Sequence, residues 1–286
     1  MDIIKKLLAL GLVVVMAAAT VVGCGNKDAA KKKAAVIEID LTNEEYAFGV
    51  DKAQPELLEK VNAFIAEIKA NGKFDEICNN NFGTGTPVAV ESADLDTSKD
   101  QLVVATNAAF EPFEYKKGDK YYGIDMEIAK ALADYLNMEL VIQNMDFDSV
   151  CLSVGQHTCD IAMAGLTVKE DRKEHVDFST SYYTASQKLI VTSDNKEFAD
   201  CKDAAAVEAI LKAKDKKTKI GVQTGTTGQF YCEGDADWGF DGFPVTTIGY
   251  KNGSLAVQDL LNGNLNYVVI DSAPAKCITE AINKMQ

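Results

Sequence analysis

The sequence contains few of the residues that build metal or redox centres. It has 2 histidines, His157 and His175, and no two of its 7 cysteines stand at CxxC spacing. Zinc sites need several such ligands at short spacings, and thioredoxin-like redox sites need the CxxC pair. We therefore expect no metal and no cofactor. The Gly-Thr-Thr-Gly stretch at 225–228 is no phosphate-binding P-loop, because no Gly-Lys-Ser/Thr follows it.

Basic residues are also scarce. The chain has 29 lysines and arginines against 43 acidic residues, a net charge of −14. Loss of an N-terminal signal would remove two lysines and one aspartate, which leaves 29 − 2 = 27 basic and 43 − 1 = 42 acidic residues, or −15. A surface this acidic excludes nucleic acid and anionic lipid surfaces as partners.

Only the N-terminus carries a long hydrophobic run. The run extends from Leu7 to Val22 after two lysines, and it is shorter than the roughly 20 residues that span a bilayer. This pattern predicts a signal peptide over residues 1–23. The run ends in Val-Val-Gly-Cys, which resembles a bacterial lipobox, so we expect a lipid on Cys24 and a polar tether over residues 24–35. The alternative is an ordinary secretory peptide with an incidental cysteine.

The six remaining cysteines are an even number in an exported chain, which permits disulfides. They allow roughly fifteen pairings, and the sequence does not choose among them. Proximity along the chain favours Cys151 with Cys159 and Cys201 with Cys232.

From residue 102 onward, short apolar strands alternate with amphipathic helices. A first series predicts strands at 102–105, 140–142 and 161–164 with helices at 125–136 and 148–154. A second series predicts strands at 189–192, 219–222, 246–250 and 267–270 with helices at 203–213 and 254–261. Such alternation is typical of α/β folds with parallel strands, which bind ligands where the strands end.

Residues suited to a zwitterionic amino acid follow several of these strands. Arg172 can hold a carboxylate through two hydrogen bonds. The turn at 225–228 leads into a helix start, where free amides favour an anion, and Asp271 can hold an ammonium. Each feature alone has an ordinary structural explanation, such as a surface ion pair for Arg172 or a helix cap for Asp271. Their combination predicts an amino-acid site.

Several stretches resemble the amino-acid-binding proteins of ABC importers, the polar-amino-acid receptors of solute-binding protein family 3. The matching stretches are residues 102–115, 122–137, 147–183, 219–228 and 260–275. The resemblance implies a type II periplasmic-binding-protein fold, α/β with two lobes and a hinge. It also implies a monomer without enzymatic activity that closes on a free amino acid and delivers it to a permease. The protein would lie on the outer face of the cell membrane or in the periplasm.

The resemblance and the chemistry of the residues also predict the ligand contacts. Phe110 stacks on the ligand, Arg172 holds its carboxylate and Asp271 holds its ammonium. The full set of expected ligand-binding residues is Asn107, Phe110, Phe147, Ala164, Gly165, Thr167, Arg172, Gln223, Thr226, Thr227 and Asp271. Receptors for cationic side chains commonly carry an acid where this chain has Asn107, so we expect a polar or small neutral amino acid. Glu111, Glu114 or Asp148 could replace that acid.

The chain departs from the family in the order of its segments. Family members end with a segment that resembles residues 44–83 here, yet in this chain that segment precedes all the others. We interpret this order as a circular permutation in which residues 84–100 join the ancestral ends. Lobe 1 is then expected at 47–190 and lobe 2 at 36–46 with 191–286, with crossings near 46–49 and 189–193.

Two other functions share the features described so far. Dehydratases similar to cyclohexadienyl dehydratase have the same two-lobe fold, but no candidate base lies beside the predicted pocket. A ligand-sensing module would need a transmembrane or signalling segment, which the sequence does not contain beyond its N-terminal run.

Overall fold

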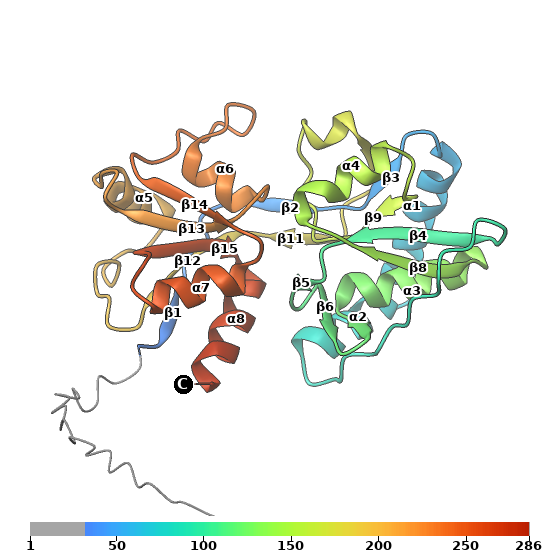
Figure 1. The fold of residues 1–286 in the computed structure, drawn as a ribbon, viewed down its shortest axis with the longest axis horizontal. Coiled ribbons are helices and arrows are strands. Elements are labelled where there is room, and N and C mark those ends of the chain that lie inside the picture. The colour runs from blue at the N-terminus through green and yellow to red at the C-terminus, as the bar shows by residue number, and fades with distance from the viewer. Residues whose placement is uncertain (1–31, 286) are drawn as a thin grey trace, which may run out of the picture. The chain divides into compact units, whose positions relative to one another are not determined.

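The computed structural model describes residues 32–285. The predicted signal peptide and Cys24 lie outside these residues. The described part forms two α/β lobes, each built on a five-stranded sheet (Figure 1). None of the helices in this part combines the length and the apolar character needed to cross a membrane.

The sheet of lobe 1 has the strand order β10-β3-β9-β4-β8. These strands are β10 (Val176–Phe178), β3 (Gly49–Asp51), β9 (Ile161–Ala162), β4 (Gln101–Thr106) and β8 (Glu139–Asn144). β4 is parallel to both β8 and β9, which confirms the predicted parallel unit. β3 lies between β9 and β10 and is antiparallel to both, so the complete sheet is mixed.

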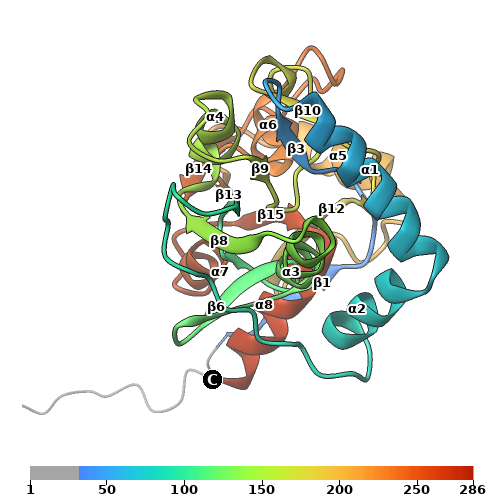
Figure 2. The ribbon, with the colours of Figure 1, turned by 90° about the vertical axis from the view of Figure 1, so that its right-hand side faces the viewer.

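Helices cover both faces of the lobe 1 sheet (Figure 1 and Figure 2). They are α1 (Pro55–Ala70), α2 (Lys73–Phe82), α3 (Ile124–Leu136) and α4 (Val150–Gly155), with the 3-10 turns η1 (Phe147–Ser149) and η2 (Arg172–Glu174). α1 begins at Pro55, where the fixed φ of proline suits the first helical turn. Its buried residues recur at helical spacing: Leu57, Val61, Phe64, Ile65 and Ile68.

A small antiparallel sheet completes lobe 1 beside the site. Its strands are β5 (Ala109–Phe110), β6 (Glu114–Lys117) and β7 (Lys120–Tyr122). The sequence patterns did not predict these strands, because strands of two to four residues carry little periodicity.

The sheet of lobe 2 has the strand order β1-β12-β15-β13-β14. These strands are β1 (Ala34–Ile37), β12 (Gln187–Thr192), β15 (Tyr267–Asp271), β13 (Lys219–Gln223) and β14 (Thr246–Tyr250). The helices are α5 (Ala204–Lys212), α6 (Thr227–Glu233), α7 (Gly253–Leu261) and α8 (Ser272–Lys284). β13 is parallel to β14 and β15, so their carboxyl ends carry Gln223 and Asp271 to one edge.

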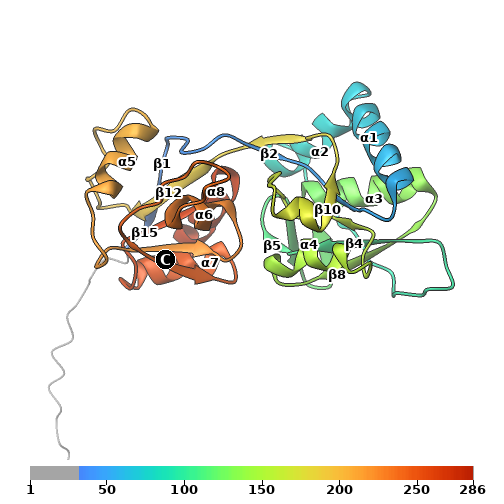
Figure 3. The same ribbon diagram turned by 90° about the horizontal axis from the view of Figure 1, so that it is seen from above.

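A two-stranded ribbon links the lobes (Figure 3). It pairs β2 (Glu44–Tyr46) with β11 (Tyr183–Ala185) in antiparallel register. The predicted second crossing at 189–193 is wrong, because all of β12 already belongs to the lobe 2 sheet through its pairing with β1 and β15. The crossing lies instead at β11, a few residues earlier.

Residues 84–100 connect α2 to β4 without forming a helix or a paired strand beyond one bridge. That bridge joins Val90 to Tyr121 through two backbone hydrogen bonds. Val90 is 2% exposed and belongs to the main apolar core. The segment is therefore anchored to lobe 1 at its middle.

The predicted disulfides are wrong. All six cysteines of the described residues are free thiols. Cys232 is fully buried in the apolar core of lobe 2, and burial raises the pKa of its thiol. It serves there as a small apolar side chain, a role that proximity along the chain does not reveal.

Candidate functional site

One cavity between the lobes gathers most of the predicted ligand-binding residues. Its empty space, with the open solvent at its mouth included, is about 250 Å³, and it is lined by Phe110, Phe147, Gly165, Thr167, Arg172, Gln223, Thr226, Thr227 and Asp271. All nine were expected from the sequence. The other two expected residues, Ala164 and Asn107, lie directly behind the wall of the cavity. Ala164 is buried next to Gly165, and Asn107 accepts a hydrogen bond from Gln223.

Arg172 provides the positive charge of this cavity. It is the only arginine in the sequence, and it is 8% exposed. Its Nη1 donates to the carbonyl oxygen of Thr167 at 2.7 Å, and its Nη2 donates to that of Gly225, in lobe 2, at 3.0 Å. The guanidinium carbon lies 5.3 Å from the centre of the Phe147 ring.

No carboxylate of the described residues forms an ion pair with Arg172. Asp171 is the neighbour of Arg172 in the chain, but the only group of Arg172 that donates to it is the backbone N–H, at 2.7 Å. A guanidinium has five N–H donors, and two of them are used by carbonyl oxygens. A buried cation without a counterion is costly, so the remaining donors favour an anion from outside the chain.

Asp271 provides the negative charge. It ends strand β15 and is 5% exposed. The hydroxyl of Tyr46, on the hinge strand β2, donates to its Oδ1. Burial, and then the charge of Glu44, raise the pKa of Asp271 to about 7, while the bond from Tyr46 opposes this shift.

Gly165 closes one side of the cavity with its backbone. A side chain at this position would meet the Phe110 ring at 3.0 Å, and φ is +54°. Its N–H donates to Asp125 at 2.9 Å, and Tyr182 donates to the other oxygen of that carboxyl group at 2.7 Å. Burial raises the pKa of Asp125 to about 7. Asp125 therefore holds the loop on which Gly165 lies.

The far end of the cavity is closed by two amide side chains. Gln223 Nε2 donates to Asn107 Oδ1 across the lobes at 3.0 Å, and Asn107 Nδ2 donates to the carbonyl oxygen of Met145 at 2.7 Å. Gln223 Oε1 is buried without a hydrogen-bond donor from the described residues. This end therefore offers a neutral acceptor to a ligand side chain.

The acids that could have served a cationic side chain do not line this cavity. Glu114 is fully buried, and burial raises its pKa well above the usual range. Glu111 contributes to a groove at β5 and β6 instead. Asp148 lies in the wider pocket described next.

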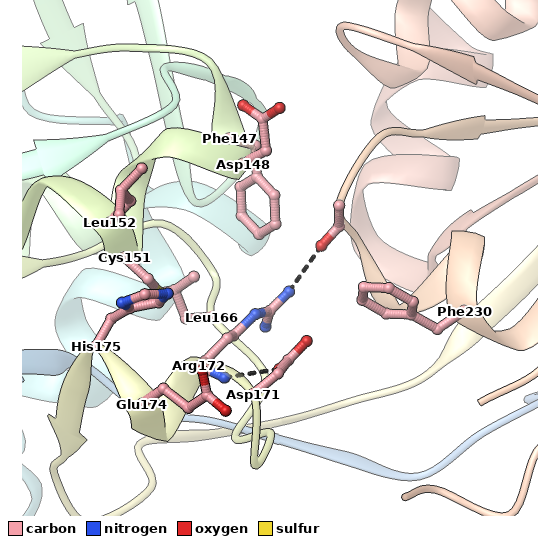
Figure 4. Close-up of a pocket in the computed structure, with 11 residues that line it drawn as sticks. Phe147, Asp148, Cys151, Leu152, Leu166, Asp171, Arg172, Glu174, His175 and Phe230 are labelled. Atoms are coloured by element: carbon pink, nitrogen blue, oxygen red, sulfur yellow. Dashed lines mark hydrogen bonds between the residues drawn. The ribbon is translucent and has the colours of Figure 1, made fainter. Parts of the chain in front are cut away.

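A wider pocket of about 760 Å³ opens beside the same arginine (Figure 4). Its walls include Phe147, Leu152 and Phe230, and its acids are Asp148, Asp171 and Glu174. Arg172 contributes to both spaces, but Asp271 does not line the wider one. The pairing of a buried cation with a buried anion is therefore confined to the smaller cavity.

A lysine joins the two lobes outside the cavity. Lys169, from lobe 1, is 4% exposed, and its Nζ lies 2.8 Å from Asp171 and 3.0 Å from Asp235 of lobe 2. It also lies 4.4 Å from the Phe230 ring and 5.7 Å from the Trp238 ring. Burial opposes its charge, but the two aspartates outweigh this effect and raise the pKa of Lys169. Trp238 packs against this contact and does not line the cavity.

Sequence reasoning missed the residues that support the site without lining its cavity. Glu44 holds Thr167, and Tyr46 holds Asp271. Asp125 holds Gly165, and Lys169 holds the second lobe. Tyr46 and Asp271 are separated by 225 positions in the chain. No local spacing could have indicated such a pair.

Two α/β lobes with an interlobe cavity that sets one cation against one anion are typical of a protein that binds a small ligand carrying both charges. The sequence matches the bacterial extracellular solute-binding proteins, family 3, over residues 102–280. The chain belongs to this family.

Similar proteins are known among receptors for amino acids. The chain is 36% identical over 132 residues to an arginine-binding extracellular protein of Bacillus subtilis, an alignment that covers 46% of this chain and 47% of that protein. It is 33% identical to a probable histidine-binding protein of Neisseria gonorrhoeae, with 59% and 58% covered. These alignments span only about half of each relative's length.

Solved structures give the same picture of the fold. An ancestral arginine-binding protein bound to arginine matches with a TM-score of 0.53 and 30% identity, covering 64% of this chain and 75% of that one. An ancestral amino-acid-binding protein described as a precursor of cyclohexadienyl dehydratase matches with a TM-score of 0.54 and 28% identity, over the same shares of the two chains.

Proposed function

We propose that the protein binds a free amino acid in the cavity between its lobes and delivers it to the permease of an ABC transporter. One observation carries this proposal: Arg172 is buried without a carboxylate partner in a cavity that also contains Asp271. An α-carboxylate and an α-ammonium would satisfy both charges. Because Asp271 and Arg172 come from different lobes, such a ligand would stabilise the state in which the lobes meet.

The direct test is a thermal-shift screen of the purified protein against the twenty amino acids, followed by calorimetry on each that stabilises it. We expect stabilisation by at least one of them, with a dissociation constant in the micromolar range or below. A flat response to all twenty would contradict the proposal.

For the side chain of the ligand, we propose a polar or small neutral group. The amides of Asn107 and Gln223 can pair with an uncharged donor, and Asp271 is the only acid that lines the cavity. Relatives named for arginine and histidine favour a cationic ligand instead. Calorimetry with glutamine and with arginine separates these two classes, and tighter binding of arginine would overturn the neutral assignment.

An enzyme on the same fold is the second candidate. Its support is the similarity to a precursor of cyclohexadienyl dehydratase, together with the pKa of Asp271 near 7, which suits a proton donor. We propose a binding protein without catalytic activity, because the hydroxyl of Tyr46 donates to Asp271 and favours the ionised carboxylate that an ammonium needs. Incubation with any amino acid that binds, followed by product analysis, would reveal enzymatic activity.

We also propose that the chain is circularly permuted. The backbone N–H of Ala34 donates to Asn283 Oδ1 at 2.9 Å, and Asn283 Nδ2 donates back to the Ala34 carbonyl oxygen at 2.9 Å. The start of β1 and the end of α8 are therefore neighbours, as the ancestral connection requires. In addition, β3 lies inside the lobe 1 sheet although it precedes the family match at 102–280.

A chain restored to the ancestral order tests the permutation. A short linker would join the end of α8 to β1, and new termini would open within residues 91–100, beyond the bridge at Val90. We expect this chain to fold and to bind the same amino acid within about threefold of the original affinity, because no contact of the cavity changes. A chain that remains unfolded, as judged by circular dichroism, would count against the permutation.

We also propose that the protein lies outside the cytoplasm, is held there by a lipid on Cys24 and acts as a monomer. Expression of the full chain in a bacterial host should give a product that partitions into detergent. The variant Cys24→Ser should remain in the aqueous phase. Equal partitioning of both would argue against the anchor.

Lys169 is expected to hold the lobes together in the ligand-bound state. Lys169→Met keeps most of the apolar stem but removes its charge from between Asp171 and Asp235. We expect ligand dissociation to accelerate about tenfold, since ~1–2 kcal/mol of interlobe attraction is lost. Stopped-flow measurement of dissociation checks this. Lys173→Met is the matched control, because Lys173 is exposed and pairs with Glu170 of its own lobe; equal rates in both variants would exclude the role.

A further inference from the structure

Glu44 is a buried carboxylate that supports the proposed site without lining it. It lies on the hinge strand β2 and is 5% exposed. No cation of the described residues forms an ion pair with it, and it does not line the cavity. A carboxylate buried in this way needs strong hydrogen-bond donors.

Three side chains supply those donors. Thr42 and Gln187 donate to Oε1 of Glu44 at 2.5 and 3.0 Å, and Thr167 donates to Oε2 at 2.8 Å. The Thr42 hydroxyl accepts the backbone N–H of Gln187 at 2.9 Å, so its own proton is free for Glu44. An ionised carboxylate only accepts hydrogen bonds. Glu44 therefore determines the direction in which the Thr167 O–H points.

This direction matters because Thr167 lines the cavity. When its proton is held by Glu44, the hydroxyl oxygen has two lone pairs left. The Thr227 hydroxyl, from lobe 2, approaches that oxygen at 3.2 Å and uses one of them. The other lone pair makes Thr167 an acceptor toward a ligand, and Asp271 adds a second acceptor in the same cavity.

We propose that Glu44 is a positioning residue through which the cavity selects an α-ammonium over an α-hydroxyl group. It acts through Thr167, whose hydroxyl it turns into an acceptor. An ammonium donates to both Thr167 and Asp271, whereas an α-hydroxyl has a single proton and satisfies only one of them. The inference rests on the proposed amino-acid binding.

The test compares ligands that differ only at the α position. The pairs are L-alanine with L-lactate, L-serine with L-glycerate and L-arginine with L-argininate, measured by calorimetry with wild type and Glu44→Gln. In the variant, the amide NH₂ can donate to Thr167, which turns the Thr167 proton toward the cavity. For each amino acid that wild type binds, we expect discrimination against its hydroxy partner to fall at least tenfold in the variant.

A matched control and a second variant keep the outcomes distinct. Glu45→Gln removes a neighbouring exposed carboxylate and is expected to leave discrimination unchanged. Unchanged discrimination in Glu44→Gln overturns the inference, while failure of wild type to bind any amino acid overturns the proposed function itself. If Glu44→Gln does not fold, Thr167→Val removes the hydroxyl that Glu44 orients. Discrimination equal to wild type in Thr167→Val overturns the inference as well.

Discussion

Replacing Arg172 with alanine is expected to weaken amino-acid binding by at least ~2 kcal/mol, or about thirtyfold. The ligand carboxylate would enter a cavity whose only cation has been removed. The contact to Gly225 of lobe 2 would be lost at the same time, which weakens the closed arrangement of the lobes. Isothermal titration calorimetry of wild type and variant measures the difference directly.

Arg172→Lys separates charge from geometry. A lysine keeps the positive charge but lacks the planar fork that can hold Thr167, Gly225 and a carboxylate together. We expect an affinity between those of wild type and the alanine variant. Lys173→Ala, one position away and exposed, controls for the change in net charge. An Arg172→Ala protein that binds as tightly as wild type would remove the basis of the proposed function.

Most of the strands that end beside the site could be predicted because their signals are local. The alternation of apolar and polar residues predicted β4, β8, β13 and β15 almost to their ends. The carboxyl ends of parallel strands share an edge, so the convergence of Gln223 and Asp271 in lobe 2 follows from topology. Arg172 lies in η2 of lobe 1 and meets them only across the two lobes.

The supporting residues depend on contacts that cross the hinge. Glu44 meets Thr167 across 123 positions and Gln187 across 143 positions. The bridge of Tyr46 to Thr167 and the pairing of β2 with β11 bring these segments together. The misplaced crossing has a similar cause. Gln187 and Lys188 interrupt the apolar pattern, yet they pair with Asp271 and Ile270 as part of β12. A search for hydrophobic periodicity does not detect polar residues at the end of a strand.

The pKa of Asp271 predicts that binding depends on pH. Burial and the charge of Glu44 raise this pKa to about 7, so the carboxyl group is protonated below that pH and ionised above it. Only the ionised form can hold an ammonium. Affinity should therefore fall as the pH decreases from 8, by up to about tenfold per unit below 7. Binding at pH 6.5 should also release protons, because the ammonium favours the ionised form.

Asp271→Asn tests this assignment in two ways. At pH 8 the variant should bind amino acids at least ~2 kcal/mol more weakly, because an amide does not neutralise the ammonium. It should also release fewer protons on binding at pH 6.5, as measured by calorimetry in buffers of different ionisation enthalpy. Asp119→Asn, at an exposed turn, is the control. A variant with the affinity and proton release of wild type would show that another group holds the ammonium.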